Sequence, residues 1–222
     1  MVESIYFKIF YVIASYLLGS VVFGYVMARI LGGKGFGVVD RPGTAGAGRM
    51  FGLKAAVPTL IFDCGKGVAV ALIARHFIRP DTINIGGNVI DINITLIIAC
   101  LAVLIGHNWP VWYKFRGGGG LATAMGIGGA LAPIQFLIVL ATSLLIATIY
   151  RFTLYRKKHM VSPNVIGGLI GVIMMPIVVS FYPIFIEEFR IEYLILFIGV
   201  LIIIVTKGII LHFMYRKVPT AA

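Results

Sequence analysis

The chain has 222 residues, of which 60% are hydrophobic and only 12% are charged, and its mean hydropathy is +1.03. Soluble globular domains are about half apolar and a quarter charged, so this composition excludes an ordinary soluble domain, a disordered chain and a coiled coil. At roughly 20 residues for each membrane-spanning helix, the length allows about six to eight spans. We therefore expect one integral membrane domain over residues 1–222, with the lipid bilayer as its main surroundings.

The net charge of +11 would indicate nucleic acid binding in a soluble protein. In a membrane protein, Lys and Arg collect in cytoplasmic loops, where anionic headgroups or anionic substrates are their partners. We accordingly expect no nucleic acid partner. Cys64 and Cys100 lie in apolar stretches without metal-ligand spacing, and we interpret them as packing residues.

Seven apolar runs follow one another along the chain. They cover residues 5–31, 54–74, 92–113, 121–132, 134–150, 164–183 and 192–215. Pro133 follows a glycine-rich run and lacks a backbone donor, so we place a turn between the fourth and fifth runs there. A single long kinked helix over both runs is the alternative.

Cations are distributed unevenly between the connections. Twelve Lys and Arg residues lie in the first, third and fifth connections and the C-terminal tail, whereas three lie in the other connections, where acidic residues gather. Because cytoplasmic loops are enriched in Lys and Arg, this asymmetry predicts the orientation. The predicted fold is an all-α polytopic membrane protein with seven transmembrane helices, the N-terminus outside and the C-terminus cytoplasmic, in the cell membrane.

Residues 41–49 form a small-residue segment that begins and ends with an arginine. Small residues leave backbone N–H groups accessible, and tandem N–H groups near guanidinium groups suit a phosphate. A flexible basic loop without a ligand explains the same composition equally well.

A second glycine-rich segment comes before the fourth apolar run. Its cations and glycines are Lys114, Arg116, Gly117, Gly118, Gly119 and Gly120. A glycine run that leads into a helix N-terminus is a sound anion site, since the helix dipole and the unpaired N–H groups point at the ligand. His107, at the membrane boundary just before this segment, is a candidate general base; a histidine hydrogen-bonded within a loop is the alternative.

Asp63 and Lys66 form the third candidate site. Their i, i+3 spacing places them on one face of the second helix. An ionisable pair inside a membrane span is costly unless it is paired and faces inward, so it indicates a functional site. An internal salt bridge that anchors helix packing is the alternative.

Four segments of the chain resemble the bacterial membrane acyl-phosphate:glycerol-3-phosphate acyltransferases, the PlsY-type family. They read YLLGSVVFGY at 16–25, DCGKG at 63–67, GHNWP at 106–110 and FRGGGGLAT at 115–123. The segments occur in the family's order and cover about the first 60% of the chain. The last two helices match in hydropathy alone.

This resemblance implies transfer of a fatty acyl group from acyl phosphate to glycerol 3-phosphate, giving lysophosphatidic acid without a metal or other cofactor. The implied catalytic residues are His107, Thr44 and Lys66. The implied phosphate-binding residues are Gly43, Gly46, Ala47, Arg49, Lys114, Arg116 and Gly117 to Gly120. An acyl phosphate is already activated, so such a protein need only bind two anions, align the hydroxyl and stabilise an oxyanion.

The chain also departs from the family pattern. Residues 42–49 read PGTAGAGR where the family usually has SGNxGATN, so that Gly43, Gly46 and Ala47 match. Gly119 stands where the family has a lysine, and the family's C-terminal His, Arg, Glu and Asn motif has no counterpart. A catalytically impaired or altered-specificity relative that binds phospholipid precursors, or assists an active enzyme, is therefore the alternative function.

Overall fold

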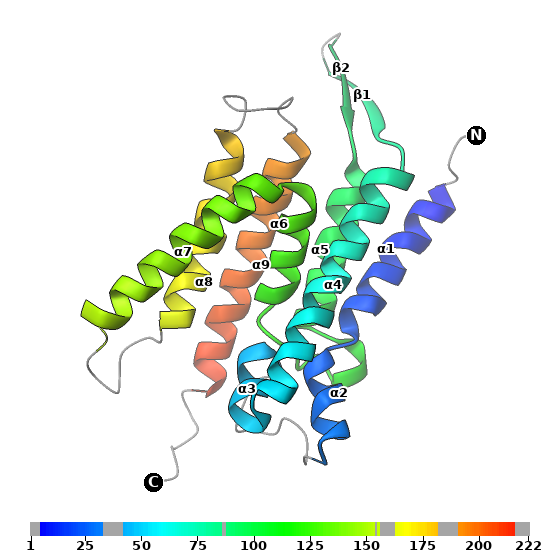
Figure 1. The fold of residues 1–222 in the computed structure, drawn as a ribbon. Coiled ribbons are helices and arrows are strands. Elements are labelled where there is room, and N and C mark those ends of the chain that lie inside the picture. The colour runs from blue at the N-terminus through cyan, green and yellow to red at the C-terminus, as the bar shows by residue number, and fades with distance from the viewer. Residues whose placement is uncertain are drawn as a thin grey trace.

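The computed structural model describes residues 5–32, 42–85, 88–153, 155, 163–181 and 191–215. Its elements are α1 (Ile5–Ser20), α2 (Phe23–Ile30), α3 (Thr44–Phe51), α4 (Leu53–Phe77), β1 (Asp81–Ile85), β2 (Asn88–Ile92), α5 (Ile94–Asn108), the 3-10 helix η1 (Val111–Tyr113), α6 (Leu121–Leu131), α7 (Pro133–Thr153), α8 (Pro163–Ser180) and α9 (Ile191–Tyr215). The long helices lie side by side in a bundle (Figure 1). The hairpin of β1 and β2 lies at one end of this bundle, and α2 and α3 lie at the other.

Within the described residues, five helical segments are long and apolar enough to cross a membrane. They are 5–30, 53–77, 94–113, 133–153 and 191–211, and the shorter apolar helices 121–131 and 165–180 accompany them. The expected turn at Pro133 is confirmed, because α6 ends at Leu131 and α7 begins at Pro133. Phe136 of α7 folds back against Gly128 of α6.

Three features differ from the expectations. The first apolar run is broken between Ser20 and Phe23 into α1 and α2. Residues 44–51, expected as a loop, form the helix α3. The chain is not purely α-helical, since residues 81–92 include an antiparallel hairpin in which Asp81 pairs with Ile92 and Ile85 with Asn88. Helix propensity and hydropathy are weak guides for such short segments, whose structure depends on the helices that they join.

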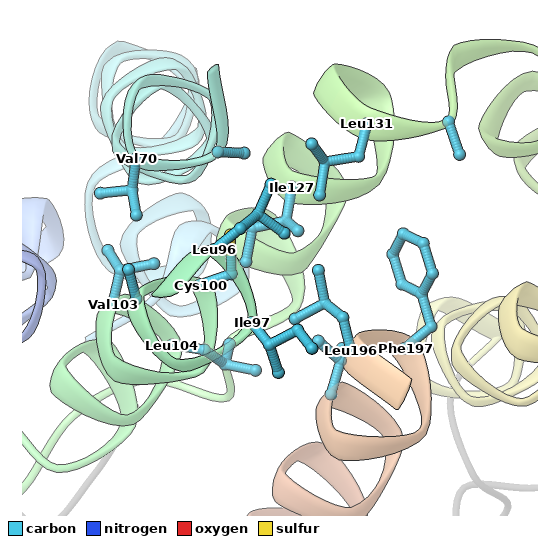
Figure 2. Close-up of a cluster of buried hydrophobic side chains, with 14 of the residues drawn as sticks. Val70, Leu96, Ile97, Cys100, Val103, Leu104, Ile127, Leu131, Leu196 and Phe197 are labelled. Atoms are coloured by element: carbon cyan, nitrogen blue, oxygen red, sulfur yellow. The ribbon is translucent and has the colours of Figure 1, made fainter. Parts of the chain in front are cut away.

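The hydrophobic core is centred on α5. Its buried side chains meet those of α4, α6 and α9, and Figure 2 shows Leu96, Cys100 and Leu104 of α5 among Ile127 of α6 and Leu196 of α9. The many large apolar side chains left exposed on the outer faces of the helices are those expected in contact with lipid.

Glycines allow two pairs of helices to approach closely. A Cβ at Gly106 of α5 would overlap the carbonyl oxygen of Tyr16 in α1. A Cβ at Gly126 of α6 would likewise overlap the carbonyl oxygen of Cys64 in α4. Small residues at helix interfaces are the usual device for close packing in membranes. These contacts fix α1, α4, α5 and α6 around the polar groups described next.

Candidate active site

Asp63, Lys66 and His107 form a buried polar cluster between α4 and α5. Their side chains are 1%, 7% and 2% exposed, respectively, as whole residues. Lys66 Nζ lies 2.9 Å from Asp63 Oδ1 and 3.0 Å from His107 Nδ1. The i, i+3 pair predicted from the sequence is thus an inward-facing ion pair, and the tertiary structure adds the histidine from 41 residues further along the chain.

This ion pair lies at the break between α1 and α2. Lys66 Nζ donates to the carbonyl oxygens of Gly19 and Val21, both at 3.0 Å. The backbone N–H of Phe23, the first residue of α2, lies 3.4 Å from Asp63 Oδ1. A cation at a helix C-terminus and an anion at a helix N-terminus are each stabilised by the helix dipole and by unpaired backbone groups. The broken helix and the ion pair therefore stabilise one another.

His107 lies directly beneath the glycine-rich segment 117–120. Its Nδ1 lies 3.0 Å from Lys66 Nζ and 3.5 Å from Asp63 Oδ1, so both members of the ion pair contact the ring. The carbonyl oxygen of His107 accepts a hydrogen bond of 3.2 Å from the backbone N–H of Gly118. A Cβ at Gly118 would overlap the His107 imidazole at Nε2, so only glycine fits there without displacing the ring. The buried cluster and the shape of the glycine-rich segment are therefore coupled.

Segment 114–120 leads directly into the N-terminus of α6. Gly120 is the N-cap of α6 and has φ +82°, which favours glycine. Lys114 and Arg116 are exposed. Among the described residues, Gly119 has no heavy atom within 4 Å of a Cβ built on it, so this position is open toward them. The segment thus combines two exposed cations, a glycine run and a helix N-terminus, as an anion site requires.

The segment around α3 lies at the same end of the bundle, and α2 lies beside both segments (Figure 1). Gly24 of α2 packs against the backbone of Pro42, and the hydroxyl of the next residue, Tyr25, donates to the Arg116 carbonyl oxygen at 2.6 Å. Gly43 is the N-cap of α3, and Thr44 is its first residue. The hydroxyl of Thr44 is buried and has no hydrogen-bond partner among the described residues.

The other predicted residues of this segment have different positions within α3. Gly46 and Ala47 are buried, with Ala47 packed in a small apolar cluster that also holds Met27 and Ala55. Arg49 is exposed in the last turn, at the end of α3 opposite to its N-terminus. In the expected loop, Arg49 and the backbone N–H groups would bind the same phosphate. The helical conformation instead places Arg49 away from the N–H groups at the N-terminus of α3. Arg41 lies outside the described residues.

Sequence reasoning missed Lys207, Asn108 and Thr123. Lys207 of α9 is 3% exposed, and its Nζ donates to the Asn108 carbonyl oxygen at 2.5 Å. Asn108, the last residue of α5, and Thr123, in the first turn of α6, are fully buried. The signal in the sequence was a lone lysine within the strongly apolar run 192–215, because an ionisable residue inside a span indicates a functional site.

An apolar cavity of about 250 Å³ lies between α6, α7, α8 and α9. It begins at Leu121, which directly follows the N-cap Gly120, and it reaches Phe136 and Met175. Ala124 and Gly168 line the cavity and, being small residues, fill little of it. The cavity therefore opens an apolar space next to the polar glycine-rich segment.

Comparisons with known proteins give one consistent result. Residues 9–214 match the family described as glycerol-3-phosphate acyltransferase. The chain is 35% identical over 153 residues to a glycerol-3-phosphate acyltransferase of Cupriavidus metallidurans, which covers 66% of this chain and 69% of that protein. It is 32% identical over 169 residues to that of Shouchella clausii, covering 74% and 75%. Its fold is similar to the crystal structure of PlsY (YgiH), an integral membrane glycerol 3-phosphate acyltransferase, in the lysophosphatidic acid form, with a TM-score of 0.70, 23% identity, and 95% and 93% of the two chains covered.

Proposed function

Because this chain belongs to the glycerol-3-phosphate acyltransferase family, as its motifs predicted, we propose that it transfers a fatty acyl group from acyl phosphate to the 1-hydroxyl of glycerol 3-phosphate. The products are lysophosphatidic acid and phosphate. The observation that carries this proposal is the buried cluster of Asp63, Lys66 and His107 beneath a glycine-rich helix N-terminus. Such an arrangement suits a reaction in which both substrates are phosphate anions.

In the proposed reaction, the hydroxyl oxygen of glycerol 3-phosphate attacks the acyl carbonyl carbon. A new ester C–O bond forms, the C–O bond to phosphate breaks, and phosphate leaves with the electron pair and accepts the hydroxyl proton. The protein's task is to bring the two anions together and to stabilise the oxyanion of the intermediate. No protein nucleophile is needed, since the acyl donor is already activated.

The residues have separate roles in this proposal. Lys114, Arg116 and the N–H groups of segment 117–120 bind phosphate, as do the N–H groups of Gly43, Thr44 and Gly46 at the start of α3. The Thr44 hydroxyl, which has no hydrogen-bond partner among the described residues, accepts a hydrogen bond from the attacking hydroxyl. Lys66 and His107 hold the glycine-rich segment in shape, since both are buried and Gly118 packs on the imidazole. Ala47 packs α3 against its neighbours, and Arg49 contributes a positive charge to the exposed surface of α3.

The chain is a multi-pass membrane protein, and we propose that it crosses the cell membrane seven times, with its C-terminal end cytoplasmic. The start of α1 and the end of α9 lie at opposite ends of the bundle, which is consistent with an odd number of crossings (Figure 1). Seven crossings require α6 and α8, although each is shorter than the other spans.

Cysteine labelling tests this topology. A cysteine at Tyr155, in the fifth connection, is expected to react with a membrane-impermeant maleimide only after the inner face is exposed. A cysteine at Thr82, on the hairpin, is expected to react in intact cells. Equal labelling of both positions from one side would contradict the seven-span arrangement.

The activity itself is tested with the purified protein in detergent. Palmitoyl phosphate and glycerol 3-phosphate are expected to give lysophosphatidic acid and one equivalent of phosphate. Folded protein without turnover would instead favour the impaired relative, for which the open position of Gly119 is the supporting observation. Gly119→Lys then decides, because a gain of turnover would show that the native site lacks a catalytic cation.

The apolar cavity supplies the place for the acyl chain. Ala124→Phe is expected to fill it and to lower kcat/KM for palmitoyl phosphate by about tenfold, the effect of roughly two lost methylene contacts, with a smaller loss for octanoyl phosphate. Ala141→Phe, at an exposed position of α7 that does not line the cavity, is the matched control. Equal losses for both chain lengths would show that the acyl chain binds elsewhere.

A further inference from the structure

Helix α2 contacts both of the segments to which the proposed function assigns phosphate binding. A Cβ at Gly24 would come within 2.7 Å of the carbonyl oxygen of Pro42, which directly precedes the N-cap of α3. The next residue, Tyr25, donates its hydroxyl hydrogen to the carbonyl oxygen of Arg116 at 2.6 Å. Two consecutive residues of one short helix therefore touch one segment each.

Tyr25 contacts the turn 113–116 in two places. Its ring stacks on the ring of Tyr113, with the centroids 4.0 Å apart and the planes 13° from parallel. Its hydroxyl binds the carbonyl oxygen of Arg116, the residue directly before Gly117 and the glycine run. Stacked aromatic pairs and buried or partly buried hydrogen bonds each contribute to stability, so one side chain holds the turn at its first and last residues.

The turn 113–116 has a backbone conformation that requires such support. Lys114 and Phe115 have φ values of +50° and +60°, in the left-handed region. Residues with a side chain pay free energy in this region and adopt it only where their surroundings enforce it. The two contacts of Tyr25 with this turn stabilise the left-handed pair and fix the point at which the glycine run begins.

Helix α2 is itself anchored at its start. Lys66 Nζ donates to the Val21 carbonyl oxygen at 3.0 Å, and the backbone N–H of Phe23 lies 3.4 Å from Asp63 Oδ1. The ring of Phe23 also stacks on Phe62 of α4, with the centroids 4.0 Å apart. These contacts lie two residues before the tyrosine. A helix that is fixed to α4 and touches both segments sets the distance between them.

We propose that Tyr25 is a positioning residue, which holds the turn 113–116 against α2 and, together with Gly24, sets the separation of the two phosphate-binding segments. This inference rests on the proposed function, in which both segments bind phosphate. Tyr25 acts through the backbone and does not touch a substrate. Because the rate of a reaction between two bound substrates depends steeply on their alignment, a changed separation lowers kcat more than it changes the binding of either substrate.

Steady-state kinetics of Tyr25→Phe tests this role. The variant loses the hydroxyl and keeps the ring that stacks on Tyr113. Its kcat is expected to fall by about tenfold, with the KM of each substrate within about twofold of wild type. Tyr11→Phe is the matched control, because it also removes a tyrosine hydroxyl that donates to a carbonyl oxygen, that of Val70 at 2.7 Å. Tyr11 lies about 13 Å of helix before the end of α1, and its loss should leave kcat unchanged.

Gly24→Ala tests the contact with the other segment. Its Cβ would meet the backbone of Pro42, so α2 or the start of α3 must shift. A fall of kcat with both KM values retained is expected, although Tyr25 is unchanged. Gly129→Ala, near the other end of α6, is the control, since its Cβ meets Phe136 at an ordinary contact distance of 3.6 Å. Wild-type kcat in Gly24→Ala would contradict a role of α2 in the separation of the segments.

Limited proteolysis measures the hold on the turn without turnover. Trypsin cleaves after Arg116, at the carbonyl group to which the Tyr25 hydroxyl donates. Cleavage of a folded chain requires local opening. Loss of one hydrogen bond in Tyr25→Phe is therefore expected to raise the initial rate of cleavage after Arg116 by about fivefold to tenfold, as followed by mass spectrometry. Tyr11→Phe should be cleaved there at the wild-type rate.

The two measurements separate the possible outcomes. An unchanged cleavage rate in Tyr25→Phe would overturn the proposal, because the hydroxyl would then not hold the turn. Faster cleavage with wild-type kcat would also overturn it and leave Tyr25 as a structural anchor. A raised KM with unchanged kcat would point to substrate binding instead of positioning. Wild-type protein without turnover would refute the proposed function, whereas the cleavage rates would still decide whether Tyr25 holds the turn.

Discussion

Replacement of Lys66 by methionine is expected to lower the free energy of unfolding by about 3–5 kcal/mol, because Asp63 would remain buried as an uncompensated charge. Asp63→Asn is expected to have a similar effect, since Lys66 then loses the carboxylate at 2.9 Å. The double variant Asp63→Asn/Lys66→Met removes both charges and should recover much of this loss. Reversible unfolding in mixed micelles, followed by circular dichroism, measures all three variants against the wild type.

The same variants separate the two interpretations of this ion pair. If the pair only anchors helix packing, the double variant should regain turnover together with stability. We expect the stability to return and the turnover to stay at least about 100-fold below wild type, since the ammonium that orients His107 is absent. Recovery of both quantities would assign the pair a purely structural role.

Replacement of Gly118 by alanine is expected to have the second large effect. Its Cβ would overlap the imidazole of His107, so either the ring or the glycine-rich segment must move. A displacement of about 1 Å in a catalytic site can cost about 100-fold in rate, and we expect a loss of kcat/KM of this size. Initial rates of phosphate release measure it.

Gly119→Ala provides the neighbouring comparison. Its Cβ meets no atom of the described residues within 4 Å, and the backbone N–H of residue 119 is retained. The loss of kcat/KM should therefore stay below about tenfold, the upper range for a small substitution that disturbs local backbone freedom. A loss at Gly119 equal to that at Gly118 would show that glycine flexibility, rather than the contact with His107, is what the segment requires.

The sequence predicted the features that depend on one segment at a time. Hydropathy predicted the five helical segments of the described chain that are long and apolar enough to cross a membrane, because transfer of a helix into lipid depends mainly on its own side chains. The Asp63 and Lys66 pair was predictable for a similar reason, since i, i+3 spacing on one helix brings two residues to one face. The turn at Pro133 followed from the missing backbone donor of proline.

Other features were beyond the sequence. The run 17–23 contains no proline, and its single glycine does not mark a helix end, yet α1 ends at Ser20. The break occurs where Lys66, 45 residues from Val21, binds the carbonyl oxygens that the broken helix frees. Expecting a loop at 44–51 was wrong because small residues there pack as a short helix against α2 and α4.

The composition and motif order of this chain were enough to predict a membrane acyltransferase family, two glycine-rich segments and an ion pair within a predicted span. Which groups meet depends on how the helices pack: His107 lies beneath Gly118, and Lys207 contacts Asn108 across 99 residues. The side chains of Asn108 and Thr123 are buried there without a hydrogen-bond partner among the described residues. The physical reason is that hydropathy and helical spacing act within a segment, whereas close packing of glycine faces and the pairing of buried polar groups depend on several helices at once.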